Sequence, residues 1–475
     1  MIVNENKMGK RCCIGAALFV AWLIVLPLQA GLHTDVTRIL RSQGKVTYGV
    51  HVVDAESGKV LFAHNANTPM KPASNMKILT TAVALKQLGP GFEFVTRVGM
   101  VGQSLVVVGS GDPLLGDSVI DEALGRKSGW VFSDIAERLT RMEVKQIKGI
   151  VVDSTVFDDQ RAHPSWPVND LNRWFAAEVC GINYNRNCVN MTFTKKGGHV
   201  AVAVEPKTGF LTLDNQTVAI SSGKEAVGSW RKPGQPNHLA LKGKVKKEQG
   251  PIQVAIEKPA AFFGFLLAEA LSRQGIQVEG QLLEVAFRDL DAFQPVAEYR
   301  TTLVQCLHRC NKDSLNLAAE ALLKTVAAQA MEGGCNGSWP VGQQVFTAYL
   351  ASLGIPAEEF VVDDASGLSH RNRISPRAFT RVLQDMYRSE QWSLYKESLA
   401  IAGVDGTIKK YAAFKQDPYR GRILGKTGYI NGAKSFSGIC LTDSGTYLFS
   451  ILANKTNGQT RSAINLIAQA IVDNG

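Results

Sequence analysis

The chain has 475 residues, of which 45% are hydrophobic and 20% are charged, and its formal net charge is +10. This is the balance of an ordinary globular protein, and the length is sufficient for two or three domains with their own cores. Eight cysteines in a chain of this length are too few for a disulfide scaffold.

The first 30 residues predict a secretory signal peptide. Three basic residues precede an apolar run over residues 12–28, and the small residue Ala30 follows it. We therefore expect an exported, periplasmic protein. An uncleaved anchor is the alternative, because about 17 apolar residues can just span a bilayer. Export argues against nucleic acid as the partner of this basic chain, and leaves a membrane surface or cell-wall polymers as possible peripheral contacts.

Residues 31–91 predict the start of an α/β domain. We expect a short helix over residues 34–42, a strand hairpin over residues 46–63 and a helix over residues 75–88 that ends at Gly89. Apolar side chains cover most of the circumference of the last helix, so we expect it to be buried on all sides.

Residues 92–285 differ in character, because short β-like runs alternate with glycine, asparagine and proline. They predict a β-rich insertion of one or two subdomains, with one helical segment near residues 131–143 and a helix over residues 262–274. The last third returns to a mixed pattern, with helices expected at 301–310, 315–331, 340–353, 376–388 and 459–473, and strands at 421–427, 434–441 and 446–453. We therefore expect a discontinuous catalytic domain formed by residues 31–91 and 286–475.

Three short motifs occur in one order along the chain: Ser74-Asn-Met-Lys77, Ser314-Leu-Asn316 and Lys426-Thr427-Gly428. Each motif alone is weak, because such short patterns arise by chance. Their order and their local settings together indicate a serine acyl-transfer site of the penicillin-recognising kind.

The first motif has the spacing of an activated nucleophile. A serine hydroxyl needs a base within hydrogen-bonding reach, and Ser74 and Lys77 lie on one face of the predicted helix. Burial and a second cation, for which Lys426 is the candidate, would lower the pKa of Lys77. An isolated Ser74 or Ser314 would more often be a helix N-cap. A lysine on a buried apolar helix is harder to explain without a function, because burying its charge is costly.

The other two motifs offer groups that can bind a peptide. Ser314 precedes a predicted helix and can relay a proton, while the Asn316 amide can both donate and accept hydrogen bonds. Lys426 and Thr427 alternate across a predicted strand, and Gly428 lets a substrate backbone come close. An edge strand of this kind can align an extended peptide.

With these motifs the chain resembles the class C low-molecular-mass penicillin-binding proteins, the D-alanyl-D-alanine carboxypeptidase/endopeptidase family of the penicillin-binding protein 4 type. Further segments carry the resemblance: residues 48–58, 109–113, 166–170, 183–185, 364–369 with Asn372, and 405–407. It implies an α/β (α+β) fold in which an antiparallel sheet is flanked by helices. It also implies hydrolysis of the D-Ala-D-Ala end of peptidoglycan stem peptides, with an endopeptidase activity on D-Ala–diamino acid cross-links as a further expectation. β-Lactams would be inhibitors, and no metal or organic cofactor is implied.

The resemblance also implies roles for individual residues. Ser74 would be the acylated nucleophile, Lys77 its general base and Ser314 the proton shuttle to the leaving D-alanine. The backbone N–H groups of Ser74 and Tyr429 would form the oxyanion hole. The implied substrate-binding set is Asn316, Lys426, Thr427, Gly428, Tyr429, Asp170 and His370.

Two positions depart from the family pattern. Ala365 stands where the family usually has glycine, and His370 stands where it usually has arginine. His370 and, from the insertion, Asp170 are expected near the side chain of the stem peptide, so the departure at His370 concerns substrate preference rather than acylation.

Two other functions remain open at this point. A β-lactamase would need a deacylating base, for which the region after the second motif offers Glu358 and Glu359. A non-catalytic wall-binding protein could keep the fold, although the intact Ser74, Lys77 and Lys426 argue against it. The sequence specifies no oligomeric state, and Cys180 and Cys188 are candidates for a disulfide.

Overall fold

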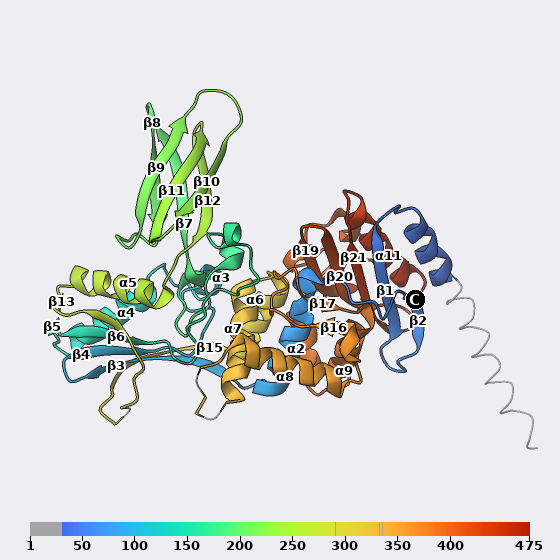
Figure 1. Cartoon of the computed structure of the whole chain (residues 1–475), viewed down its shortest axis with the longest axis horizontal. Coiled ribbons are helices and arrows are strands. Elements are labelled where there is room, and N and C mark those ends of the chain that lie inside the picture. Colours follow the sequence, from blue (N-terminus) through green and yellow to red (C-terminus); the bar gives the residue numbers. More distant parts are fainter. Residues whose placement is uncertain (1–30, 290, 332, 335) are drawn as a thin grey trace, which may run out of the picture.

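The computed structural model describes residues 31–289, 291–331, 333, 334 and 336–475. The predicted signal peptide covers residues 1–30 and lies outside these described residues. Within them, no helix combines the length and the apolar character needed to cross a membrane. Figure 1 shows three lobes: a terminal lobe (residues 31–91 and 303–475), a middle lobe (residues 92–187 and 256–302) and an outer lobe (residues 188–255) that projects away from the other two.

The terminal lobe is built on a six-stranded antiparallel sheet. Its strands, in spatial order, are β18 (Ala400–Ile401), β19 (Ile423–Ile430), β20 (Ala433–Leu441), β21 (Thr446–Asn454), β1 (Thr47–Asp54) and β2 (Val60–His64). β1 pairs with β21 along its whole length, with Val50 opposite Ile451. Segments from the two ends of the chain therefore form one sheet.

Helices cover both faces of this sheet. One face packs against residues 31–41, which are helical, and α11 (Thr460–Asp473). The helices on the other side are α2 (Met76–Leu88), α6 (Leu303–Lys312), α7 (Asn316–Gln329), α8 (Trp339–Ser352), α9 (Pro376–Tyr387) and α10 (Trp392–Ser398). α2 lies at the centre of this group, and all its residues from Met76 to Leu85 are buried, which confirms the predicted fully buried helix. The short strands β16 (Phe360–Val361) and β17 (Arg373–Ile374) pair beside it.

The middle lobe contains a mixed five-stranded sheet. Its order is β14 (Leu282–Glu284), β6 (Gly149–Asp153), β4 (Ser104–Val108), β3 (Glu93–Val101) and β15 (Gln294–Thr302). The pairs β4–β6 and β6–β14 are parallel and therefore need crossover connections, which contain α3 (Ser118–Ala123) and α4 (Trp130–Arg141) in one case and α5 (Pro259–Arg273) in the other. A two-stranded pair, β5 (Gln146–Ile147) with β13 (Gln277–Val278), lies beside them.

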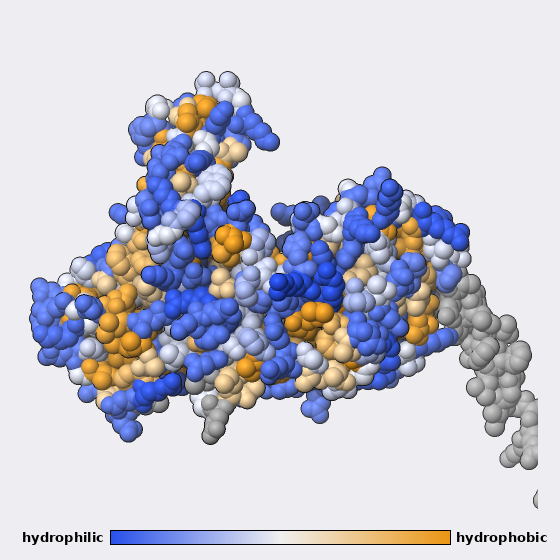
Figure 2. Space-filling view, in the orientation of Figure 1, coloured by the Kyte–Doolittle hydropathy of each residue, from blue (hydrophilic) through white to orange (hydrophobic). Residues whose placement is uncertain are grey.

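The outer lobe is inserted into the second of these crossovers. It consists of two three-stranded sheets: β12 (Glu248–Ala255), β7 (Cys188–Lys196) and β8 (His199–Glu205) in one, and β10 (Ala226–Lys232), β11 (Gln235–Val245) and β9 (Thr212–Ala219) in the other. Figure 2 shows an open notch between this lobe and the terminal lobe, with mostly hydrophilic surface on both sides.

Two details differ from what the sequence suggested. β15 pairs with β3, so the sheet of the middle lobe extends beyond residue 285, and we propose residues 92–302 as the inserted part. Cys180 and Cys188 are buried free thiols and form no disulfide. They lie in separate apolar clusters, Cys180 in the core of the middle lobe and Cys188 with Ala177 and Ala255.

Candidate active site

Ser74 lies in a short turn of 3₁₀ helix, η1 (Ala73–Asn75), that leads directly into α2. The side chains of Asn75 and Ser437 are 2.6 Å apart, which attaches this turn to the central strand β20. β19 also packs closely against it, because a Cβ added at Gly428 would lie 2.9 Å from the Ser74 nitrogen and 2.8 Å from the Pro72 oxygen. The glycine of the third motif therefore brings β19 close to the backbone at Ser74.

Lys77 is fully buried one turn after Ser74. Its Nζ lies 3.3 Å from Ser74 Oγ, 2.7 Å from Asn316 Oδ1 and 2.8 Å from the carbonyl oxygen of Ser366. Burial lowers the pKa of Lys77 to about 8, although the negative charges of Glu320 and Asp364 act in the opposite direction. An amine with this pKa, at hydrogen-bonding distance from a hydroxyl, can accept its proton near neutral pH.

Lys426 is the second buried amine. Its Nζ donates to the carbonyl oxygen of Thr427 at 2.7 Å, and burial together with the positive charge of Lys77 lowers its pKa well below the ordinary range. Burial is the largest cause of the lowered pKa at both lysines, so desolvation contributes more here than the neighbouring cation. The hydroxyl of Thr427 donates to that of Thr407 at 3.1 Å.

The catalytic pocket, a cavity of about 650 Å³, lies above these two lysines. Every predicted site residue except the two buried lysines lines it: Ser74, Ser314, Asn316, Asp170, His370, Thr427, Gly428 and Tyr429. The three motifs and the inserted lobe thus meet around one space, with the amines beneath it.

Ser314 reaches the pocket from the connection between α6 and α7. Its φ is +61°, in the left-handed region that residues other than glycine, asparagine and aspartate seldom adopt. Such conformations persist where the surrounding structure imposes them, often at functional sites. Asn316 begins α7, and besides accepting from Lys77 its amide donates to the Phe175 carbonyl oxygen at 2.7 Å.

Asp170 and His370 lie at the part of the pocket that adjoins the middle lobe. Asp170 ends the short helix η2 (Val168–Asp170) and enters the pocket from the insertion. Burial and the positive charges of Lys71 and Arg373 lower the pKa of His370, against the opposing charge of Asp170. His370 is therefore uncharged at neutral pH, unlike the arginine that the family pattern usually has there.

Sequence reasoning assigned no role to Glu320, a fully buried carboxylate on α7 four residues after Asn316. It accepts hydrogen bonds from the backbone nitrogens of Ser366 at 2.8 Å and Ala365 at 3.2 Å, and from Trp339 Nε1 at 2.8 Å. Since the carbonyl oxygen of Ser366 accepts from Lys77, Glu320 holds the backbone that orients the amine. Burial raises the pKa of Glu320 to about 7. The available signal was an acidic residue in a helix whose other residues are mostly apolar.

The model of the D-Ala-D-Ala carboxypeptidase 3 (S13) family matches residues 32–472. The chain belongs to this family of serine peptidases. The D-alanyl-D-alanine carboxypeptidase of Actinomadura is 27% identical over 462 residues, covering 91% of this chain and 82% of its own. The D-alanyl-D-alanine carboxypeptidase DacB of Haemophilus influenzae is 24% identical over 429 residues, which cover 87% of this chain and 86% of that protein.

The fold of this S13 family member also has a close counterpart among solved structures. Penicillin binding protein 4 (DacB) from Haemophilus influenzae superposes with a TM-score of 0.78 at 22% identity, covering 92% of this chain and 98% of that one. A structure of the same protein complexed with a β-lactam has a TM-score of 0.74. The family and the fold class expected from the sequence are confirmed.

Neither alternative function is favoured in an S13 family member. Glu358 and Glu359, considered as deacylating bases, lie outside the catalytic pocket, and the buried Glu359 is paired with Arg377. Asp170 is the sole carboxylate among the described residues that line the pocket. Nowhere in the described ranges do three or more histidine, cysteine or acidic side chains form a group that could bind a metal.

Proposed function

We propose that this chain is a serine-type D-Ala-D-Ala carboxypeptidase that acts on peptidoglycan stem peptides through an acyl-enzyme on Ser74. The observation that carries the proposal is the position of Lys77 Nζ, 3.3 Å from Ser74 Oγ and fully desolvated beneath the pocket lined by all three motifs. Membership of a D-Ala-D-Ala carboxypeptidase family supports the substrate class.

In the first step the uncharged amine of Lys77 accepts the hydroxyl proton as Ser74 Oγ attacks the carbonyl carbon between the two D-alanines. The backbone N–H groups of Ser74 and Tyr429 stabilise the oxyanion, to which each donor contributes about 3–4 kcal/mol. Ser314 passes a proton to the departing nitrogen, so that D-alanine leaves as an amine and an ester remains on Ser74. Water then hydrolyses this ester and restores the hydroxyl.

Substrate binding surrounds these groups. The amide of Asn316 holds the peptide backbone, and Thr427 binds the terminal carboxylate, with the buried Lys426 behind it. Gly428 lets the peptide lie along β19 as an added strand. Asp170 and His370 contact the side chain of the stem peptide. Because the imidazole of His370 is uncharged, it favours a stem-peptide side chain of different chemistry from the one that the usual arginine would bind.

We also propose that β-lactams acylate Ser74 and that the protein is exported to the periplasm by residues 1–30. The β-lactam complex of the Haemophilus influenzae relative supports the first of these statements. The basic and apolar pattern of the N-terminus supports the second.

Labelling with a fluorescent penicillin tests the nucleophile. We expect the wild type to label covalently, and Ser74→Ala to abolish labelling and D-alanine release together. Mass spectrometry of digested muropeptides then identifies the product: loss of one alanine is the expected result, and splitting of cross-linked dimers would add the endopeptidase activity. A wild type that neither labels nor releases alanine would contradict the proposal.

A further inference from the structure

A second cavity adjoins the catalytic pocket. The outer pocket, formed by residues 168–173, 230–236 and Glu257, has a volume of about 780 Å³. Asp170 lines both cavities, so a ligand that extends past Asp170 leaves one and enters the other. None of the three motifs reaches this cavity, which lies between the middle and outer lobes.

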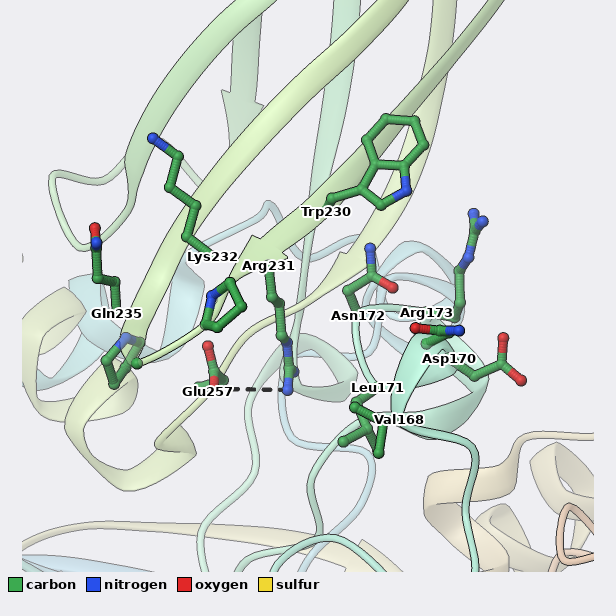
Figure 3. Close-up of a pocket in the computed structure, with 14 residues that line it drawn as sticks. Val168, Asp170, Leu171, Asn172, Arg173, Trp230, Arg231, Lys232, Gln235 and Glu257 are labelled. Carbon is green, nitrogen blue, oxygen red and sulfur yellow. Dashed lines mark ion pairs between the residues drawn. The ribbon is translucent and has the colours of Figure 1, made fainter.

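The walls of the outer pocket are held in place by hydrogen bonds. The backbone nitrogen of Ala255 donates to the carbonyl oxygen of Asn172 at 3.0 Å, and the buried Asn172 amide donates to the Ser229 backbone. Arg231 and Glu257 form an ion pair of 3.7 Å within the pocket, drawn as a dashed line in Figure 3. The pocket is therefore a formed cavity with its own internal bonds.

Trp230 presents an open aromatic surface in this pocket. A Cβ added at Gly228 would lie 2.8 Å from the indole ring, so one part of the ring rests on the backbone of β10 at this glycine. The side that faces away from the strand leaves Trp230 49% exposed. An indole fixed on one side and open on the other is a surface on which the apolar face of a sugar ring can stack.

Arg173 supplies an available positive charge beside it. Its side chain is exposed, and within the described part of the chain it forms no ion pair, whereas Lys232 is paired with Asp214 at 2.9 Å. Figure 3 shows Trp230, Arg173 and Asp170 on one side of the pocket, and Lys232 and Gln235 on the other. An exposed guanidinium of this kind matches a carboxylate.

We infer that the outer pocket binds the sugar-proximal part of peptidoglycan: an N-acetylated amino sugar stacks on Trp230, and a carboxylate of the attached stem peptide pairs with Arg173. This inference rests on the proposed function, because the scissile bond lies at the end of the stem peptide remote from the sugar. The part of the substrate that passes Asp170 is then the part nearer the glycan. Most of the residues that line the outer pocket are polar and one presents an exposed aromatic ring, and this lining suits a sugar with an attached carboxylate better than it suits an apolar surface of another protein.

The test compares two substrates: a disaccharide–pentapeptide and the same pentapeptide without the sugars. For the wild type we expect the KM of the sugar-bearing substrate to be about ten-fold lower, the effect of one aromatic contact. Trp230→Ala should remove this difference through KM rather than kcat. Arg173→Gln should raise KM for both substrates, with partial rescue in Arg173→Lys.

Val218→Ala and Lys244→Ala are matched controls, because both residues are exposed on the same sheet and lie outside the pocket. Both should retain the sugar effect. Equal KM values for the two substrates in the wild type, or a Trp230→Ala variant that behaves like the controls, would overturn the inference.

Calorimetry with Ser74→Ala separates this inference from the proposed function, because it measures binding without turnover. Tighter binding of the sugar-bearing fragment, lost on adding Trp230→Ala, would support the pocket even if the wild type proved inactive. Equal binding of both fragments would overturn the pocket even if the wild type proved fully active.

Discussion

The catalytic pocket and the outer pocket meet at Asp170, yet they hold their cationic side chains in different ways. Lys77 and Lys426 have no exposed surface, and burial lowers the pKa of each. Arg173 is exposed on the surface of the outer pocket. Desolvation converts an amine into a base at neutral pH, whereas an exposed guanidinium can only attract and orient. The difference separates a site built for proton transfer from one built for binding.

The same contrast holds for two glycines. Gly428 on β19 lies against the backbone at Ser74, whereas Gly228 on β10 lies under the ring of Trp230. Each glycine permits a close approach. The neighbour of Gly428 is the turn that carries the nucleophile, whereas the neighbour of Gly228 is the side chain of Trp230 at the surface.

The largest expected effect comes from removing the base. Lys77→Met should lower the rate of penicillin acylation by about 100-fold or more, because general bases contribute on that scale. Lys86→Met, on the same helix but outside the pocket, should stay close to the wild type. Stopped-flow acylation with a chromogenic β-lactam measures both rates, and equal rates for the two variants would contradict the role of Lys77.

The pH dependence of the wild type sharpens this test. Only the uncharged amine accepts a proton, so acylation should rise with pH and level off above a midpoint near the Lys77 pKa of about 8. A lysine with its ordinary pKa of 10.5 would place the rise more than two pH units higher. A rate that is flat across this range, or that falls with increasing pH, would argue against a buried lysine as the base.

A smaller effect is expected from replacing Gly428 or Gly228 by alanine. Gly428→Ala should lower acylation by about 30-fold, because its Cβ would meet the Ser74 nitrogen at 2.9 Å and displace the nucleophile. Gly228→Ala should leave acylation unchanged and reduce only the preference for sugar-bearing substrates. Steady-state kinetics with a β-lactam and with both peptide substrates compares them. Similar acylation defects in the two variants would remove the distinction between the pockets.

The smallest effect is expected at Glu320. Glu320→Gln loses one backbone acceptor and the negative charge that raises the Lys77 pKa. The plateau rate should fall by about ten-fold as Lys77 loses its orientation. The midpoint of the pH profile should also move to lower pH, because the opposing charge is gone.

Glu359→Gln is the control for this variant, since Glu359 is also a buried carboxylate but is paired with Arg377 away from the pocket. It should lower thermal stability and leave the pH midpoint in place. A Glu320→Gln midpoint that stays at the wild-type value would show that Glu320 is structural only.

Much of the fold and site could be predicted from local sequence. The buried helix after Ser74 follows from its apolar residues alone, because a helix that is apolar all round can only be buried. The strands β19, β20 and β21 were predicted from short, largely apolar runs, and their predicted bounds lie within about three residues of those observed. The chemistry of Ser74 and Lys77 could also be read directly, because their spacing is set within one helical turn.

What the sequence by itself determined, then, was the family, the fold class and the three motifs, since each depends on residues close together in the chain. Only the tertiary structure decided that β15 belongs to the sheet of the middle lobe, that Glu320 holds the backbone beside Lys77, and that Trp230 and Arg173 share a pocket with Asp170. These relations join residues from about 45 to 200 positions apart, and a contact at such separation leaves no periodic pattern in either segment. The burial that lowers the pKa of Lys77 has the same origin, because it is produced by side chains from distant segments packing around one amine.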